Sequence, residues 1–215
     1  MKEQTNNLIR NFIERNPNLA HLEGEVVKAV ELLTSCVKSG NKIMTCGNGG
    51  SAADSEHIAG ELLKGFLYKR PVTNEYRLEL RNAYGEEGDF IADNLQSGIK
   101  CIPLTSFCAY NTAFLNDCNG DLLFGQLVNG LGDKNDVLIA ISTSGNSRNV
   151  LYAAKIAKIK GVKVIGLTGD KGGKLREIAD VTINVPSNVV YMIQEYHLPV
   201  YHILCAALES EIFDC

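Results

Sequence analysis

The stretch IMTCGNGGSAADSEHIAGELLK, residues 43–64, decides the fold. It begins with a short apolar run from Ile43 to Cys46, which is typical of a buried strand. Residues 47–50, Gly-Asn-Gly-Gly, follow directly, and their glycines favour a tight turn. Ser51 then stands where a helix N-cap is expected, and apolar residues at helical spacing continue to Leu63. The stretch therefore predicts a strand, a glycine turn and a helix.

This turn also predicts an anion site. The free N–H groups at a helix N-terminus point at whatever occupies the turn, and the helix dipole favours negative charge there. His57 and Glu61 follow on the same helix, four residues apart, so they share one face. Such a pair is often only a solvated surface, but it also suits acid/base chemistry or metal binding. One element thus combines a phosphate cradle with groups that can move protons.

Composition favours one α/β domain for the 215 residues, with a helical extension possible. The net charge of −4 argues against a nucleic-acid partner. No apolar run reaches the roughly 18 residues of a membrane span, and the N-terminus has no signal-peptide core. We therefore expect a cytoplasmic protein without a membrane partner. Seven cysteines that form no CxxC pair favour free thiols in a reducing compartment.

Strands are expected to alternate with helices along the chain. We expect helices at residues 1–16, 23–39, 51–64, 86–99, 107–116, 122–131, 148–160, 174–179 and 190–213, and strands at 43–46, 101–105, 136–141, 162–167 and 181–185. The strands lack period-two alternation, so they predict a parallel sheet with helices on both faces. Ligands bind at the carboxyl ends of such strands. Pro103 weakens the prediction of a strand at 101–105.

The chain reads as a single domain over residues 1–215 with two additions to the sheet. Residues 1–40 hold the N-terminal helices, whose apolar stripe from Val26 to Val37 is expected to pack on another subunit. Residues 69–100 read as an inserted helical segment, and Gly85 serves as a break within it. The residues expected to face inward from the helix in that insert are Phe90, Ile91, Leu95 and Ile99.

A second polar turn, Ser-Thr-Ser-Gly-Asn-Ser at residues 142–147, precedes another helix. A helix cap uses one hydroxyl and this turn carries four, so phosphate binding is favoured over capping alone. Nucleotide binding is the weaker alternative. Ala52 replaces the third glycine of a dinucleotide fingerprint, and the one Gly-Lys pair precedes Leu175 instead of the Ser or Thr of a Walker A loop.

The final predicted helix carries Gln194, His197 and His202 among apolar neighbours. A histidine in such surroundings is more often a core residue than a ligand, which is the interpretation favoured for His197. Gln194 and His202 are eight residues apart, about 12 Å on a straight helix, and Glu61 lies about 15 Å along its helix from Ser51. We therefore expect a neighbouring subunit to complete the site.

Four blocks of the chain resemble SIS-domain sugar-phosphate isomerases, and the phosphoheptose isomerase group most. They are CGNGGSAADSEHIAGEL, ISTSGNS, GLTGDKGGKL and IQEYHLPVYHIL, in the family's order. The resemblance covers most of the chain outside residues 69–100. It implies a flavodoxin-like parallel sheet and a homotetramer with active sites between subunits. The insert, and Met192 where the family often has arginine, depart from the pattern, and the insert leaves the exact sugar open.

The resemblance also implies roles for individual residues. Those implied to hold the substrate are Asn48, Gly49, Gly50, Ser51, Asn116, Asp117, Ser142, Thr143, Ser144, Ser147 and Gln194. Zinc is the implied cofactor, bound by His57, Glu61, Gln194 and His202, with Glu61 and His202 as the acid/base pair.

The implied reaction is an aldose-ketose isomerisation of sedoheptulose 7-phosphate to D-glycero-D-manno-heptose 7-phosphate through a cis-enediol. Two alternatives stay open. One is an isomerase for another sugar phosphate, and the other is a non-catalytic SIS protein that senses a sugar phosphate or binds a partner such as DnaA.

Overall fold

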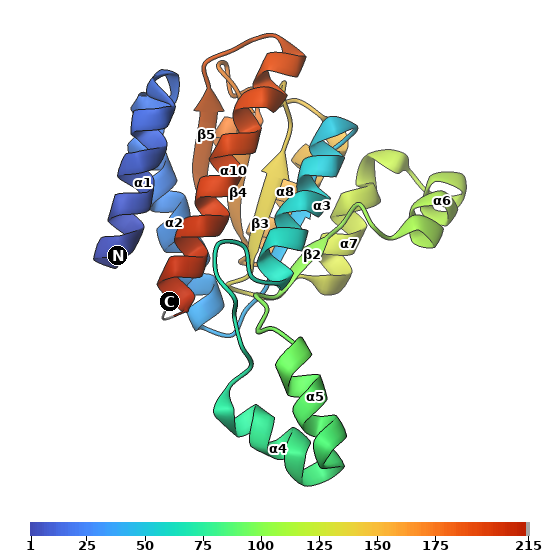
Figure 1. Cartoon of the computed structure of the whole chain (residues 1–215). Helices are drawn as coiled ribbons and strands as arrows, with labels where there is room; N and C mark the ends of the chain where they lie inside the picture. The colour runs from blue at the N-terminus through green and yellow to red at the C-terminus, as the bar shows by residue number, and fades with distance from the viewer. Residues whose placement is uncertain (214–215) are drawn as a thin grey trace.

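A parallel sheet forms the centre of the protein in the computed structural model, which describes residues 1–213 (Figure 1). Its five strands lie in the order β2-β1-β3-β4-β5. They are β1 (Ile43–Cys46), β2 (Cys101–Pro103), β3 (Val137–Ile141), β4 (Lys163–Gly169) and β5 (Val181–Val185). β1 and β3 are buried along their whole length because helices cover both faces of the sheet. The predicted parallel α/β sheet is confirmed.

The helices divide between the two faces of the sheet. They are α1 (Glu3–Arg15), α2 (Glu23–Lys38), α3 (Gly50–Leu63), α4 (Asn74–Tyr84), α5 (Glu86–Asn94), α6 (Cys108–Asp117), α7 (Leu123–Leu131), α8 (Arg148–Ile159), α9 (Leu175–Ile178) and α10 (Val190–Ile212), with 3-10 turns at Pro17–Leu22 and Gly120–Leu122. One buried cluster joins the sheet to α1, α2, α3 and α10, and a second joins it to α7 and α8. In the described part of the chain, no helix combines the length and apolar character needed to cross a membrane.

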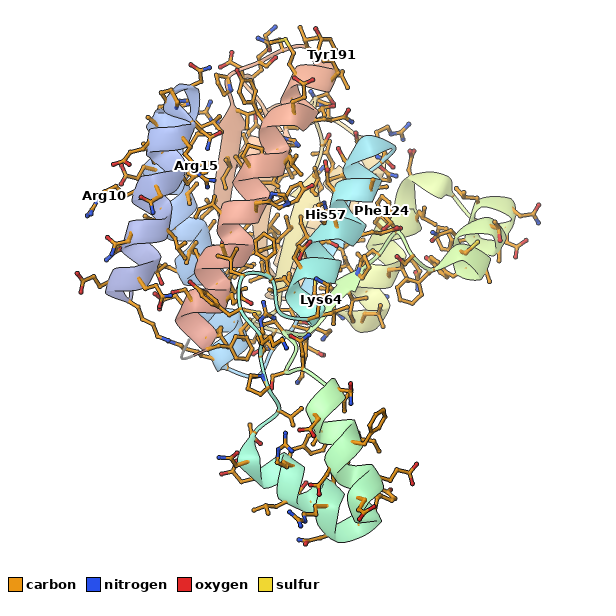
Figure 2. All side chains as sticks on the ribbon, in the orientation of Figure 1. Arg10, Arg15, His57, Lys64, Phe124 and Tyr191 are labelled. Carbon is orange, nitrogen blue, oxygen red and sulfur yellow. The ribbon has the colours of Figure 1, made fainter. Side chains whose placement is uncertain are left out.

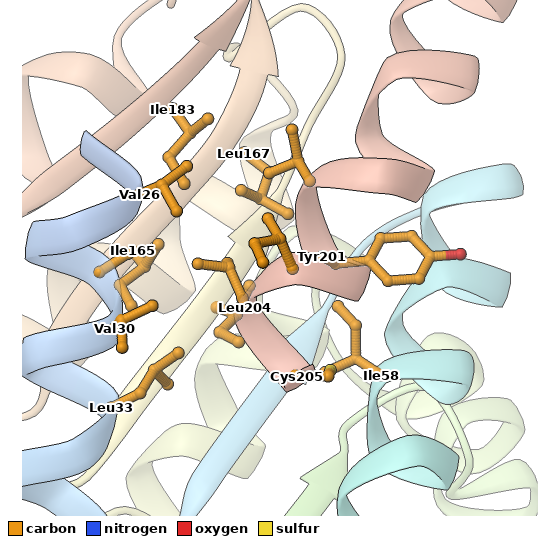
Figure 3. Close-up of a cluster of buried hydrophobic side chains, with 14 of the residues drawn as sticks. Val26, Val30, Leu33, Ile58, Ile165, Leu167, Ile183, Tyr201, Leu204 and Cys205 are labelled. Carbon is orange, nitrogen blue, oxygen red and sulfur yellow. The ribbon is translucent and has the colours of Figure 1, made fainter. Parts of the chain in front are cut away.

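The apolar stripe of α2 packs inside its own chain, which corrects the expectation that it faces another subunit. Figure 3 shows Val26, Val30 and Leu33 directed at the sheet residues Ile165 and Ile183. All three α2 side chains are almost fully buried. Burial of each such side chain stabilises the fold by about 1.5–3 kcal/mol, so this helix is needed by the core of a single chain.

The insert is a helical hairpin of α4 and α5 that extends from the body of the molecule (Figure 1). Gly85 separates the two helices with φ +61°, a backbone conformation that favours glycine. The predicted inward face is wrong in two places, because the side chains of Phe90 and Leu95 are exposed. Ile99 is buried as predicted, but it lies after the end of α5. The first helix of the hairpin, α4, was not expected.

The short strand β2 lies at the edge of the sheet, where a proline is tolerated. Pro103 pairs with Thr45 of β1 at the end of that strand, and the strand stops there instead of continuing to residue 105. β4 is longer than predicted, because Thr168 and Gly169 extend its pairing with β5.

Candidate active site

The two polar turns predicted to bind phosphate meet at the carboxyl edge of the sheet. β1 and β3 are neighbouring parallel strands, so the chain leaves both at the same edge. The amide of Asn48 exchanges two hydrogen bonds of 2.9 Å with the amide of Asn149 at the start of α8. The glycine turn is therefore joined to the first turn of α8, which directly follows the serine turn.

The cap of α3 lies two residues before the expected cap at Ser51. The N-cap is Gly49, with φ +57°, and the helix begins at Gly50. Ser51 is buried inside the first turn and makes no cap, so the prediction that it caps the helix is wrong. The turn can close this tightly because Gly47 has no side chain: a Cβ there would lie 2.5 Å from the Ser51 carbonyl oxygen.

The serine turn keeps its hydroxyls for contacts other than capping. Ser142 Oγ and Ser147 Oγ hydrogen-bond to each other at 3.0 Å, and Ser144 Oγ accepts from the N–H of Asn146 at 3.1 Å. Ser147 is the N-cap of α8, but its side chain makes no cap hydrogen bond. Ser144 is exposed and Thr143 is half-buried, so this end of α8 presents hydroxyls beside a helix N-terminus.

Glycines allow the serine turn to pack closely against the turn that follows β4. Gly145 has φ +63°, and a Cβ there would collide with the carbonyl of Gly172. The N–H of Gly169 donates to the carbonyl of Thr143 at 3.0 Å. The turn after β4 therefore packs on the serine turn and fixes its shape.

The histidines of α3 and α10 lie together farther along the two helices, which run side by side (Figure 1). His57 Nε2 is 3.1 Å from Oε1 of Glu61, and His57 Nδ1 is 2.9 Å from the hydroxyl of Tyr201. The ring centroid of His202 is 5.1 Å from that of His57, at nearly right angles. Figure 2 places His57 on the side of α3 that faces α10. The predicted acid/base pair is thus brought close to His57.

Burial tunes the charges of this cluster. It lowers the pKa of His202, the charge of His57 lowers it further, and Glu61 opposes both. His202 Nε2 is buried and has no hydrogen-bond partner in residues 1–213. Burial raises the pKa of the Asp54 carboxyl, and Tyr201 and His57 oppose this rise. The pKa of the Tyr201 hydroxyl is also raised, mainly by burial and then by the charge of Asp54.

The other histidine of α10 is a core residue, as expected. The His197 side chain is fully buried. Burial lowers the pKa of this imidazole to about 4, against a weaker opposing contact with the backbone of Thr168.

Gln194 lies near the start of α3, apart from the histidine cluster. A Cβ on Gly50 would collide with the Gln194 side chain, so the amide sits directly on the glycine turn. Gln194 and His202 are eight residues apart on α10, so they lie at different positions along α3: Gln194 at Gly50 and His202 beside His57. Within the described residues, no group of three His, Cys, Asp or Glu side chains is arranged to hold a metal ion.

Asn116 and Asp117 lie at the end of α6, at the edge of the molecule in Figure 1. Asn116 donates a hydrogen bond of 2.8 Å to Asp117, and both side chains are exposed. One chain therefore does not bring this pair to the two turns.

A groove of about 730 Å³ has His202 in its lining. It runs between α1, α10 and the segment after α3, and Phe12, Phe66 and Pro199 line it with His202. None of the residues of the two polar turns lines this groove.

Sequence reasoning missed Asn149, Asp54 and Tyr201. Asn149 stands two residues after the serine turn, where a longer motif would have included it. Asp54 lies three residues before His57, on the same helix face, which the periodicity could have revealed. Tyr201 lies in an apolar run that reads as core, and its ring is indeed 1% exposed.

Comparisons with known proteins agree with this geometry. Two models of the SIS domain match residues 7–90 and 121–207. A phosphoheptose isomerase from Akkermansia muciniphila is 35% identical over 99% of each chain.

Solved structures of phosphoheptose isomerases have a similar fold. A phosphoheptose isomerase structure from Neisseria gonorrhoeae has a TM-score of 0.71 at 32% identity, covering 96% of this chain and 98% of the other. One from Francisella tularensis has a TM-score of 0.75 at 28% identity, covering 98% of this chain and 100% of the other. This chain belongs to the phosphoheptose isomerase family of SIS-domain proteins.

Proposed function

We propose that this protein is an aldose-ketose isomerase that converts sedoheptulose 7-phosphate to D-glycero-D-manno-heptose 7-phosphate. One observation carries the proposal: His57 and Glu61 lie on α3, and the glycine turn before this helix is hydrogen-bonded through Asn48 to Asn149 at the start of α8, directly after the serine turn. Membership of the phosphoheptose isomerase family names the sugar. We expect the protein to act in the cytoplasm.

The phosphate of the substrate is held at the serine turn. Ser142, Thr143, Ser144 and Ser147 supply hydroxyls there, and the N-terminus of α8 supplies N–H groups and a favourable dipole. The glycine turn, joined to it through Asn48 and Asn149, holds the sugar. Binding energy from the phosphate, remote from the reacting carbons, positions those carbons for the chemical step.

The chemical step moves one proton between neighbouring carbons. Glu61 takes a proton from C1 of the ketose, which leaves a cis-enediol, and then returns a proton to C2. His202 moves a proton between the two oxygens, so that the carbonyl passes from C2 to C1. The lowered pKa of His202 keeps its imidazole neutral and able to accept a proton.

His57, Glu61 and His202 are side chains of the types that bind zinc, and the buried, unpartnered Nε2 of His202 is an available ligand. Within the described residues these three side chains are not arranged around one ion, so zinc binding would need them to move or a donor from a neighbouring subunit. The Gln194 side chain lies against Gly50, so it could bind the same ion only after moving away from Gly50 or from a neighbouring subunit. Zinc, when bound, would polarise the substrate carbonyl. Metal analysis of protein purified without chelator tests this part. Metal-free protein whose activity is unaffected by chelators would contradict it.

The active unit is a homotetramer with active sites between subunits. Two observations support this. No residue of the serine turn lines the groove beside His202, and Asn116 and Asp117 lie at the end of α6, at the edge of the molecule (Figure 1). A second subunit can bring such separate parts together.

A turnover screen over five- to seven-carbon ketose phosphates tests the proposed function. Sedoheptulose 7-phosphate should be converted fastest. Preference for a shorter sugar would support another sugar-phosphate isomerase instead. Tight binding of sugar phosphates without any turnover would support a sensor.

A further inference from the structure

The C-terminal end of α3 depends on donors from outside the helix. The last carbonyl groups of an α-helix have no partner within it, so other groups must satisfy them. α3 ends at Leu63, and Lys64 follows in an extended conformation. Neither Lys64 nor Gly65 has the positive φ of the glycine cap that commonly ends a helix. The carbonyl groups around Glu61 must therefore find donors elsewhere in the chain.

The stem of the insert lies at this end of α3. Arg70, Pro71, Gln96 and Ser97 form the stem, and the hairpin of α4 and α5 extends from it away from the sheet (Figure 1). Pro71 and Gln96 pair as an antiparallel bridge. The N–H of Ser97 donates to the carbonyl of Arg70 at 2.7 Å, and its hydroxyl donates to the carbonyl of Pro71 at 3.0 Å. The two ends of the insert are thus closed on each other.

The insert supplies the donors that α3 lacks. Nη1 of Arg70 donates to the carbonyl of Leu62 at 2.8 Å, and Nη2 donates to the carbonyl of Glu61 at 3.3 Å. The N–H of Ile99, two residues after the stem, also donates to the carbonyl of Leu62, at 2.8 Å. Both carbonyls belong to the last turn of α3. Residues of the insert therefore cap the helix that carries the proposed base.

The direction of the Arg70 side chain is fixed by other contacts. The side chain is fully buried, and Nε donates to the equally buried carboxylate of Glu209 at 2.6 Å. The guanidinium carbon lies 4.8 Å from the ring centroid of Phe213. A guanidinium is a rigid, planar fork of donors, so fixing one edge fixes the others. The N–H groups that remain are aimed at α3.

We propose that Arg70 is a positioning residue for Glu61. It holds the backbone of the last turn of α3 and so sets where the Glu61 carboxylate lies relative to His57, whose Nε2 is 3.1 Å from Oε1. A displacement of about 1 Å at a reacting group can cost about 100-fold in rate, so a small shift of this turn matters. The inference rests on the proposed function for the role of Glu61. The capping of α3 by the stem is a property of the folded chain.

Arg70→Lys separates the charge from the fork. Lysine keeps a positive charge for Glu209, but its ammonium is a compact point charge that does not reproduce the geometry of the guanidinium. In full-length protein we expect amide hydrogen exchange in the last turn of α3 to become about tenfold faster or more, measured by mass spectrometry. With sedoheptulose 7-phosphate, kcat per folded protein should fall about 10- to 100-fold with a smaller change in KM, because the serine turn is not touched.

A double-mutant cycle tests whether Arg70 acts through Glu61. If it does, Arg70→Lys should lower the residual proton exchange of Glu61→Gln little further, because the group that it positions is already lost. Two controls should leave both α3 exchange and kcat per folded protein unchanged. Arg77→Lys makes the same substitution at an exposed pair with Asp93 in the hairpin. Leu127→Ala removes a buried side chain of α7 from the other core cluster and reports the effect of lost stability alone.

Gln96→Ala is a second test should Arg70→Lys fail to fold. It removes the oxygen that accepts from the N–H groups of Gly65 and Arg70, and it should lower kcat in the same way by a smaller factor. Unchanged kcat per folded protein in the folded stem variants would overturn the proposal, as would an equal further loss when Arg70→Lys is added to Glu61→Gln. Faster α3 exchange in Arg70→Lys, in a protein whose wild type isomerises no sugar phosphate, would reject the proposed function and leave the capping of α3 by the stem intact.

Discussion

Ser144 is the most exposed hydroxyl of the serine turn, and its side chain accepts only from the N–H of Asn146 in the same turn. We expect Ser144→Ala to raise KM about tenfold or more with little change in kcat. A hydrogen bond to a charged group is worth about 1.5–3 kcal/mol, and a phosphate contact far from C1 acts equally before and during the chemical step. Steady-state kinetics with sedoheptulose 7-phosphate measure both constants. Ser39→Ala, an exposed serine at the end of α2, is the control. A kcat that falls as much as kcat/KM would contradict a purely binding role.

Asp136, directly before β3, makes folding stability depend on pH. Burial would raise the pKa of its carboxyl, but hydrogen bonds from the N–H and ammonium of Lys42, the N–H of Asp133 and the amide of Asn41 outweigh burial and lower it. A carboxyl whose pKa is lowered in the folded state stabilises the fold above its unfolded pKa of about 3.9. That stability is lost as the pH falls through the folded value.

We therefore expect Asp136→Asn to lower Tm at pH 7 and to lose less stability than wild type on acidification below about pH 4. Thermal unfolding followed by circular dichroism at both pH values measures this. Asp93→Asn, at an exposed pair with Arg77, should change Tm little. An equal loss of Tm at every pH would show that Asp136 stabilises through its shape and not through its charge.

At the scale of elements, a buried ion pair attaches the segment after α3 to α10. Arg70 Nε donates to Glu209 at 2.6 Å, and both side chains are fully buried. Glu209 also accepts from the N–H groups of Phe66 and Leu67 at 2.9 and 2.7 Å. Arg70 in turn donates to the carbonyl of Leu62 at 2.8 Å, in the last turn of α3. This pair therefore secures the end of the helix that carries Glu61.

We expect Glu209→Gln to lower the free energy of unfolding by about 3–5 kcal/mol, because it leaves a buried guanidinium without its counter-charge. Denaturant titration measures the loss. Asp93→Asn breaks an exposed pair and should cost about 1 kcal/mol or less. A loss for Glu209→Gln as small as that of the exposed pair would mean that backbone contacts alone hold this segment.

The sequence predicted the strands and most helices because their apolar patterns are local. It missed α4, where the apolar residues Tyr76, Leu78 and Leu80 alternate and only Leu80 is buried, so no helical stripe is visible. It placed the apolar stripe of α2 on another subunit, because the stripe is equally apolar whether its partner is a neighbouring chain or its own sheet. Pattern alone cannot choose between those two partners.

At the scale of the whole molecule, the site depends on contacts between distant parts of the chain. Asn48 meets Asn149 across 101 residues, and His57 meets Tyr201 across 144. The parallel sheet predicts the first contact, because neighbouring strands deliver both turns to one edge. It does not predict the second, which depends on how α10 lies against α3. The contact of Gln194 with Gly50 also depends on how α10 packs on α3, so the spacing of residues in the sequence could not predict it.

The oligomeric state is a property of the whole molecule. We expect light scattering of micromolar protein to give four times the chain mass of 23.4 kDa. Tetramers are expected because the serine turn, the groove beside His202 and the Asn116–Asp117 pair lie apart on one chain. Truncation before residue 16 removes α1 and one wall of that groove and should change the mass if the groove lies at a subunit interface. Active protein with the mass of a single chain would contradict an active site shared between subunits.

Proton exchange between substrate and solvent tests the central claim most directly. In deuterated water, wild-type protein should place deuterium on C1 of sedoheptulose 7-phosphate and on C2 of the aldose product, because both reach the same enediol. Glu61→Gln should lose about 10²- to 10⁴-fold in this exchange, the usual contribution of a positioned acid or base, while it still binds the sugar phosphate. Wild-type protein that binds the sugar phosphate but exchanges no proton at C1, or Glu61→Gln that exchanges at the wild-type rate, would contradict this account.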